Sequence, residues 1–209
     1  HKFRKQLLCF FIALSCVGIH AQTDKEFWFV IPYTTWKHAN STANGVGGQP
    51  ARFYVTANGA TTVAITVPKR NLTLWTKTFA AAGTAFYEVP TSLLKQGTRI
   101  EDSIQYTVND NGIHITSSTS MASVYYAIDN SNNKDLFSLK GKNALGHEFY
   151  IPLQKGLNCH SYTPAAISGF HIVATEAGTI VEITPSVALP GHPAGTPFTI
   201  TLGMGETYF

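Results

Sequence analysis

The stretch ARFYVTANGATTVAITV, residues 51–67, decides the fold class. It contains two extended runs joined at Asn58-Gly59, a dipeptide that is typical of tight hairpin turns. In the second run Val63, Ile65 and Val67 lie on one side of an extended chain, and smaller or polar residues lie on the other. An alternation of this kind predicts half-buried strands in an antiparallel sheet.

Runs of the same kind continue along the chain. Only residues 91–96 (TSLLKQ) suggest a helical turn. The sequence therefore predicts an all-β protein, with strands at 26–31, 51–57, 61–67, 72–79, 84–89, 112–117, 121–128, 147–152, 170–175, 179–184, 197–202 and 205–209.

An internal repeat organises these strands. EFW at 26–28 matches EFY at 148–150, TTVAIT at 61–66 matches TIVEIT at 179–184, and GTAFY at 83–87 matches GETYF at 205–209. The offsets of 118 to 122 residues predict tandem antiparallel β-sandwich-like units of about 120 residues. Because a propeller also repeats its strands, a propeller-like arrangement is the alternative.

The repeat predicts a domain division at 22–135 for the first unit and 136–209 for the second. The second unit has no counterpart of residues 88–128, and an unfinished sheet exposes strand edges and apolar surface. We therefore expect the second unit to be incomplete and the chain to be the front part of a longer protein.

The first 21 residues have the layout of a secretory signal peptide. Lys2, Arg4 and Lys5 form a basic start, residues 7–19 are an apolar run without charge, and Ala21 is a small residue suited to cleavage. The sequence thus predicts a secreted or cell-surface protein with no membrane span after cleavage. It retains a single cysteine, Cys159, and so no internal disulfide.

Charge excludes one class of partner. Removing the three bases of the signal from the chain's 15 leaves 12 basic residues against 12 acidic ones, a net charge of zero. Proteins that bind nucleic acid need a basic surface to neutralise phosphates. We therefore expect no nucleic-acid partner.

A family resemblance rests on the order and spacing of several segments over residues 24–209. The chain resembles the N-terminal domain of IgG Fc-binding proteins, most closely the bacterial members. This resemblance implies an extracellular, non-catalytic, adhesion-like role, and supplies no catalytic residues. Fc binding itself belongs to the animal mucus protein of the family and is not carried over. The segments are EFWFVIP (26–32), NGIHITSSTSMASVYYAID (111–129), LFSLKGKNALGHEFYIP (136–152), IVATEAGTIVEITPS (172–186) and GHPAGTPFTITLGMGETY (191–208).

The sequence lacks the complete catalytic motifs of zinc proteases, serine hydrolases and glycosidases. His147-Glu148 begins the H-E-x-x-H pattern of zinc proteases, but residue 151 is Ile. No G-x-S-x-G elbow is present for a serine hydrolase. Glu101 and Asp102 are adjacent and point to opposite sides of an extended chain, whereas glycosidases use two facing carboxylates. The sequence predicts no enzymatic activity and no bound cofactor, with calcium as the one candidate ion.

The calcium candidate is DNSNNKD, residues 129–135. It places oxygen-bearing side chains at every second position, as calcium loops do, but lacks the acidic residue that closes such a loop. The alternative is a polar turn between the two units. The candidate ligands are Asp129, Ser131, Asn133 and Asp135.

The candidate binding residues are Trp36, Tyr33 and His38, in the long polar loop 33–50, because loops on a rigid β scaffold commonly carry recognition. Trp28, within an apolar strand, is expected in the core. The predicted function is an adhesion, binding or scaffold module whose partner is an extracellular protein or glycan. A secreted glycan-active enzyme or carbohydrate-binding module is the alternative.

Overall fold

The computed structural model describes residues 23–32, 51–94, 98–102, 104–129, 134–152 and 169–209 of the chain. Within these ranges the regular elements are β-strands and three single-turn 3-10 helices: η1 (Pro68–Arg70), η2 (Thr91–Leu94) and η3 (Gly141–Ala144). The prediction of an all-β fold is confirmed. The described residues form neither a closed barrel nor a propeller, so the propeller-like alternative is wrong for this part of the chain.

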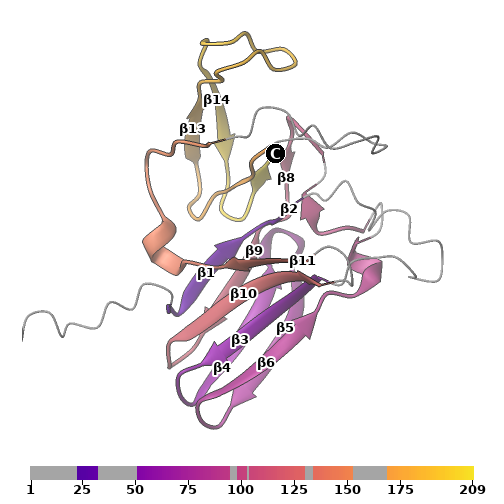
Figure 1. Cartoon of the computed structure of the whole chain (residues 1–209), viewed down its shortest axis with the longest axis vertical. Helices are drawn as coiled ribbons and strands as arrows, with labels where there is room; N and C mark the ends of the chain where they lie inside the picture. The colour runs from indigo at the N-terminus through magenta and orange to yellow at the C-terminus, as the bar shows by residue number, and fades with distance from the viewer. Residues whose placement is uncertain (1–22, 33–50, 95–97, 103, 130–133, 153–168) are drawn as a thin grey trace, which may run out of the picture.

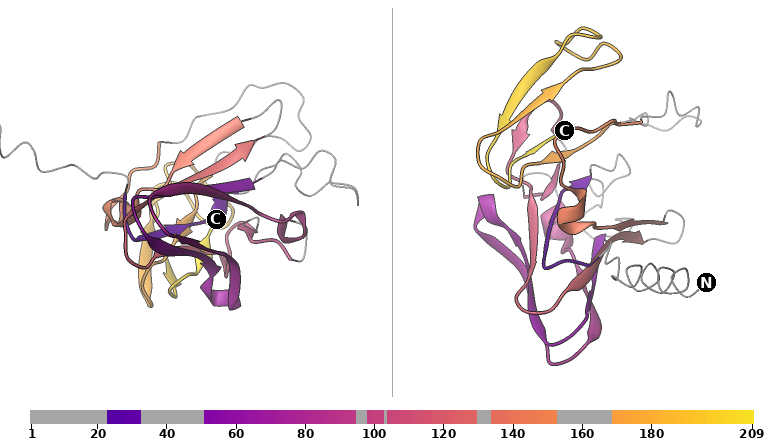
Figure 2. Two further views of the ribbon diagram at one scale, coloured as in Figure 1. Left: turned by 90° about the horizontal axis from the view of Figure 1, so that it is seen from below. Right: turned by 90° about the vertical axis from the view of Figure 1, so that its left-hand side faces the viewer.

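Two four-stranded sheets make up the larger part of the molecule (Figure 1). They lie against each other as two layers (Figure 2), which gives this region the architecture of an antiparallel β-sandwich. The first sheet has the order β1 (Glu26–Phe29), β9 (Ile113–Ser117), β4 (Thr61–Val67) and β5 (Leu72–Phe79). The second has the order β11 (Lys134–Ser138), β10 (Ala122–Asp129), β3 (Ala51–Ala57) and β6 (Gly83–Glu88).

The core of this sandwich lies between the two sheets. Every second residue of β3 and β4 is buried, as the alternation in 51–67 predicts. Aromatic rings interlock at the centre, where the ring centroids of Phe53 and Tyr126 lie 5.2 Å apart. Each buried Val, Ile or Phe side chain stabilises the fold by about 1.5–3 kcal/mol. The core includes Phe27, Phe53, Val55, Val63, Ile65, Ile113, Ile115, Val124 and Tyr126.

One predicted turn has a different role. The sequence predicts a hairpin at Asn58-Gly59, but the strands on either side of this turn belong to different sheets. β3 and β4 each carry one apolar face. Because the two strands lie on opposite sides of the same core, each buries its apolar face there. The Asn58-Gly59 turn therefore carries the chain across the sandwich.

A second, smaller region follows the sandwich. Its strands are β12 (Ile172–Val173), β13 (Thr179–Ile183), β14 (Phe198–Leu202) and β15 (Thr207–Tyr208). β12 pairs with β15 and β13 pairs with β14, all antiparallel. A separate apolar cluster lies between the two pairs, with Ala174, Leu202 and Tyr208 buried and the surrounding residues half-buried.

The two regions share strand order and register. In the sandwich β3 pairs with β6 through Tyr54 and Phe86, and in the smaller region β12 pairs with β15 through Ile172 and Tyr208. These positions are related by the offsets of 118 and 122 that the repeat has. β4·β5 and β13·β14 also correspond, with offsets of 118 and 123: Ile65 lies opposite Trp75, and Ile183 lies opposite Phe198.

A joint connects the two regions. The strand β8 (Val108–Asn109) comes from the first 135 residues and pairs with β15, so that one small sheet has the order β12-β15-β8. Beside it, the amide of Gly112 donates to the carbonyl of Gly205 at 3.1 Å, and a Cβ on Gly112 would lie 2.5 Å from that oxygen. Only glycine at residue 112 therefore allows the two backbones to approach this closely.

A remaining strand pair belongs to neither of the four-stranded sheets. β2 (Ile31–Pro32) and β7 (Glu101–Asp102) pair in parallel.

Two expectations from the sequence are wrong. Residues 147–152 form no strand, and their apolar side chains are exposed. Trp28 lies half-buried on the outer face of β1, because its neighbour Phe27 is the residue that points into the core.

Candidate functional site

The outer face of the sheet β11-β10-β3-β6 carries a row of aromatic side chains. Tyr125 on β10 lies opposite Tyr54 on β3, and Tyr54 lies opposite Phe86 on β6. The ring centroids of Tyr54 and Phe86 are 5.9 Å apart, and Phe86 is 56% exposed. Since neighbouring strands are about 4.8 Å apart, the three rings span a strip of about 10 Å. We call these three residues, with Arg52 and Glu88, the aromatic face.

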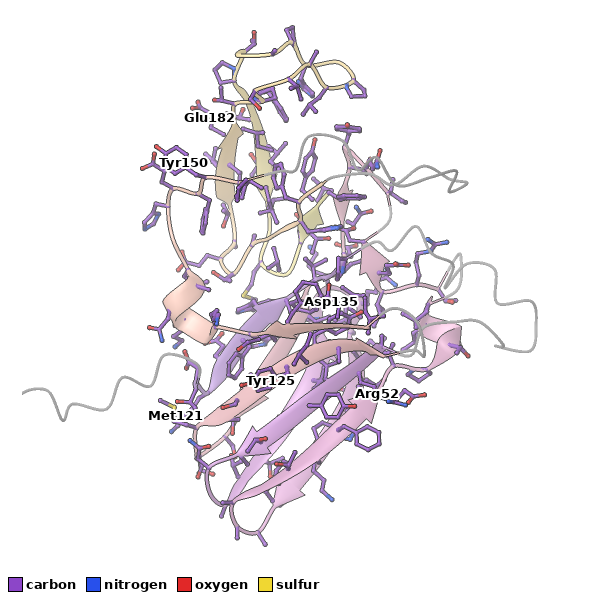
Figure 3. All side chains as sticks on the ribbon, viewed as in Figure 1. Arg52, Met121, Tyr125, Asp135, Tyr150 and Glu182 are labelled. Carbon is purple, nitrogen blue, oxygen red and sulfur yellow. The ribbon has the colours of Figure 1, made fainter. Side chains whose placement is uncertain are left out.

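Charged groups border this row. Arg52 Nε donates to Glu88 Oε2 at 2.8 Å, and the Arg52 Cζ lies 5.7 Å from the centroid of the Phe86 ring. The hydrogen bond to Glu88, followed by that to Tyr54, raises the pKa of the Arg52 guanidinium above its ordinary value. Arg52 is therefore fixed in position as a cation against an aromatic ring. Figure 3 shows Arg52 and Tyr125 on the front of this sheet.

The outer face of the other sheet is different. It carries mostly threonines, and Thr62 and Thr78 form a hydrogen bond across β4 and β5 at 3.0 Å. Its aromatic side chain is Trp28, whose ring stacks on His114 with centroids 4.1 Å apart. A Cβ on Gly205 would lie 3.6 Å from the Trp28 ring, so the second region covers this residue. The aromatic face is thus the more open of the two.

Glu26 holds the Trp28–His114 pair in place. Its carboxylate accepts a hydrogen bond from Trp28 Nε1 at 3.2 Å, lies 3.0 Å from His114 Nε2, and lies 3.3 Å from Lys142 Nζ. Burial alone raises the pKa of Glu26, but the hydrogen bonds from these three groups outweigh it and hold the pKa below its ordinary value. His114 is therefore a partnered imidazole on the sheet surface.

A buried acidic pair lies at the joint. Glu101 and Asp102 are both buried, although the sequence places them on opposite sides of the strand. Asp102 Oδ1 accepts a hydrogen bond from Asn111 Nδ2 at 3.2 Å, and Asp102 Oδ2 lies 3.6 Å from His171 Nδ1. Because a substrate in solution does not reach buried carboxylates, this cluster has the character of a structural contact between the regions.

The binding residues predicted from the sequence, Trp36, Tyr33 and His38, lie outside the described residues. Among the calcium candidates, Ser131 and Asn133 also lie outside them. Asp129 ends β10, and Asp135 is an exposed residue of β11 whose Oδ1 accepts the amide of Leu136 at 2.8 Å. In the part of the chain that the structure describes, no three His, Cys, Asp or Glu side chains gather as a metal site.

The aromatic face has a signal in the sequence that can be recognised. In 51–57, 84–89 and 121–128, every second residue is apolar and forms the core. The residues between them point outward and are expected to be polar. Tyr54, Phe86 and Tyr125 occupy these outward positions. Large aromatic residues at outward positions of three paired strands predict a surface that binds something.

Residues 136–209 match the family model described as IgGFc binding protein. The match confirms the predicted resemblance for this segment. The description of that family is that of a binding protein. No curated protein and no solved structure matches the chain. Within the described ranges, none of the helices has the length and apolar character to cross a membrane.

Proposed function

We propose that this chain is a non-catalytic, extracellular binding module with an adhesion or scaffold role, and that the aromatic face contacts a protein partner. The observation that carries the proposal is the row of Tyr125, Tyr54 and Phe86 beside the Arg52–Glu88 pair. The signal peptide predicted from residues 1–21 and the family match of residues 136–209 support the extracellular setting.

The composition of the aromatic face fits protein recognition. Tyrosine, phenylalanine and arginine are enriched at protein interfaces, and tyrosine and arginine at the positions that contribute most to affinity. Leu136, 62% exposed on β11, lies opposite Ala127 and continues the same outer surface toward the sheet edge. The rigid sheet holds these side chains in place, so binding orders few of them and loses little conformational entropy.

Binding to a protein array tests this proposal. The array contains immunoglobulin G Fc, the ligand in the family's description, together with other extracellular proteins. A protein hit should weaken at least about fivefold on Phe86→Ala or Tyr54→Ala, since important interface residues contribute more than about 1 kcal/mol. Thr76→Ala, on the exposed face of β5, is the matched control and should leave binding unchanged. Equal loss in all three variants, with the fold intact, argues against the aromatic face.

A carbohydrate ligand is the second candidate, because the same row of rings could stack against sugar rings. A glycan array with the same variants separates the two. Hits confined to glycans, and lost with Phe86→Ala, would replace the protein partner by a carbohydrate-binding role. Glycan cleavage by the purified protein would favour the glycan-active enzyme instead.

Three further predictions from the sequence belong to this proposal. Trp36, Tyr33 and His38 are proposed as an additional contact, so Trp36→Ala should weaken the same hit. A calcium site is proposed at Asp129, Ser131, Asn133 and Asp135, and calorimetry with calcium tests it directly.

The proposed units are residues 22–135 and 136–209. Limited proteolysis tests this division, with the first cuts expected within 130–146.

A further inference from the structure

The free edge of β13 corresponds to a paired edge in the sandwich. β4 has a neighbour on both sides, β5 and β9, whereas β13 pairs with β14 alone among the described strands. The residues that point inward differ in burial accordingly. Val63 and Ile65 on β4 are fully buried, but Val181 and Ile183 on β13 are only half-buried. Among the described strands, β13 therefore has no equivalent of β9, the strand that pairs with the second edge of β4.

The segment 148–151, which matches β1 in the repeat, also has no strand equivalent to β9 beside it among the described residues. In the sandwich, EFWF of β1 pairs with β9 alone among the described strands, and Phe27 is 1% exposed. The matching residues Phe149 and Tyr150 are 61% and 86% exposed, and the segment is not a strand. A strand equivalent to β9 would lie between this segment and β13. Figure 1 shows the segment that follows η3 on the same side of the molecule as β13.

We propose that the free edge of β13, with the inner face formed by Val181 and Ile183, accepts one extended polypeptide strand. The strand runs antiparallel to β13 and has the chemistry of β9, with an apolar side chain at every second position. Its backbone pairs with β13 in the manner of β-strand addition, and its apolar side chains fill the inner face. This surface is distinct from the aromatic face and does not depend on it.

The register of the sandwich also predicts the residue type at one position of the incoming strand. Thr116 of β9 lies between Glu26 on β1 and Ala64 on β4. The repeat offsets of 122 and 118 convert these neighbours into Glu148 and Glu182. Figure 3 shows Glu182 and Tyr150, which lies two residues from Glu148, at the same end of the molecule. Two acidic neighbours favour a basic residue between them, because opposite charges across strands attract. We therefore assign lysine or arginine to that position of the incoming strand.

A labelled peptide tests the proposal with the full chain. The probe is residues 111–119 with Thr116→Lys, NGIHIKSST, and fluorescence anisotropy measures its binding. We expect saturable binding that weakens roughly two- to fivefold with the unchanged Thr116 and further with Thr116→Glu. An Ile115→Asp peptide should not bind, because its carboxylate would enter the apolar inner face. Equal binding of the lysine and glutamate peptides overturns the charge assignment.

Two protein variants locate the peptide. Ile183→Ser removes an inward side chain and should weaken binding at least about tenfold. Ile180→Ser changes the same residue type on the outer face of the same strand, where Ile180 is 72% exposed, and should leave binding unchanged. Equal effects of the two changes overturn the proposed inner face.

A fused version keeps the test decisive where the free peptide binds weakly. A flexible linker joins the peptide to Phe209 and raises its effective concentration to about the millimolar range. Amide hydrogen exchange at β13 should then slow relative to a fusion with the Ile115→Asp peptide. No added protection overturns the proposal. Self-association of the unfused chain, abolished by Ile183→Ser, would show instead that a second copy occupies this edge.

Discussion

The strand pairs β4·β5 and β13·β14 have the same order and register, yet they bury their apolar residues to very different degrees. Ile65 is completely buried, and its counterpart Ile183 is half-buried. The difference is not in the strands themselves, since both alternate in the same phase. It comes from the neighbours: β9 and β10 cover the inner faces in the sandwich, and the smaller region has no described equivalent of either.

This comparison shows what local sequence determines in a β protein and what it does not. Alternation determines which side chains point inward. Burial depends on strands that are distant along the chain, because a strand contributes one face to a core that several strands complete. The same pattern can therefore form a closed core or an open apolar surface.

Matched truncations in the two regions give the largest expected effect. Ile65→Ala leaves a cavity in a closed core and should lower the free energy of unfolding by about 2–5 kcal/mol. Ile183→Ala removes a half-buried side chain and should cost less than about 2 kcal/mol. Denaturant unfolding followed by circular dichroism measures both. Similar costs would mean that the smaller region is as well packed as the sandwich.

The joint between the regions is tested at Gly112. A Cβ there would lie 2.5 Å from the Gly205 carbonyl oxygen, so Gly112→Ala should push the two backbones apart and cost about 1–3 kcal/mol. Gly83→Ala is the matched control, because its Cβ meets its nearest neighbour at an ordinary 3.6 Å. Amide exchange should rise in β8 and β15 for Gly112→Ala alone. Unchanged protection in those strands contradicts the close approach.

The smallest effect concerns the ion pair that bridges the joint. Lys69 Nζ lies 2.8 Å from Glu206 Oε1, and the hydrogen bond from Lys69 lowers the pKa of Glu206 from its ordinary 4.5. A carboxyl with a lowered pKa stabilises the fold fully above pH 4.5, and the contribution is lost as the pH falls through the folded-state pKa. Unfolding midpoints measured from neutral pH to below 4.5 should show this loss in the parent chain and not in Glu206→Gln. A parallel decline in both contradicts the assignment.

Much of the fold follows from the sequence. The strands at 51–57, 61–67 and 72–79 have the bounds that their alternation predicts, because each lies within a sheet that buries one face. The segment 147–152 has a strand pattern but forms no strand. A strand needs a partner, and in the described part of the sandwich the matching residues pair with β9.

The candidate site is harder to predict from the sequence than the fold. Tyr54 and Phe86 lie 32 residues apart in the sequence, and only the β3·β6 register brings their rings together. The sequence alone favours the loop of Trp36, because loops commonly carry recognition. It assigned Trp28 to the core because hydrophobicity alone does not distinguish the two faces of an all-apolar strand.

The pairing of β8 with β15 also constrains the order in which the protein forms. Thr207 Oγ1 donates to the carbonyl of Asn109 across 98 residues of chain. During synthesis the amino-terminal part appears first, but β8 has no partner until β15 has been made. We therefore expect the sandwich to close early and residues around β8 to settle late, because contacts between distant residues form slowly. A short segment of backbone around β8 therefore stays without its β15 partner until residues 207–208 have been synthesised.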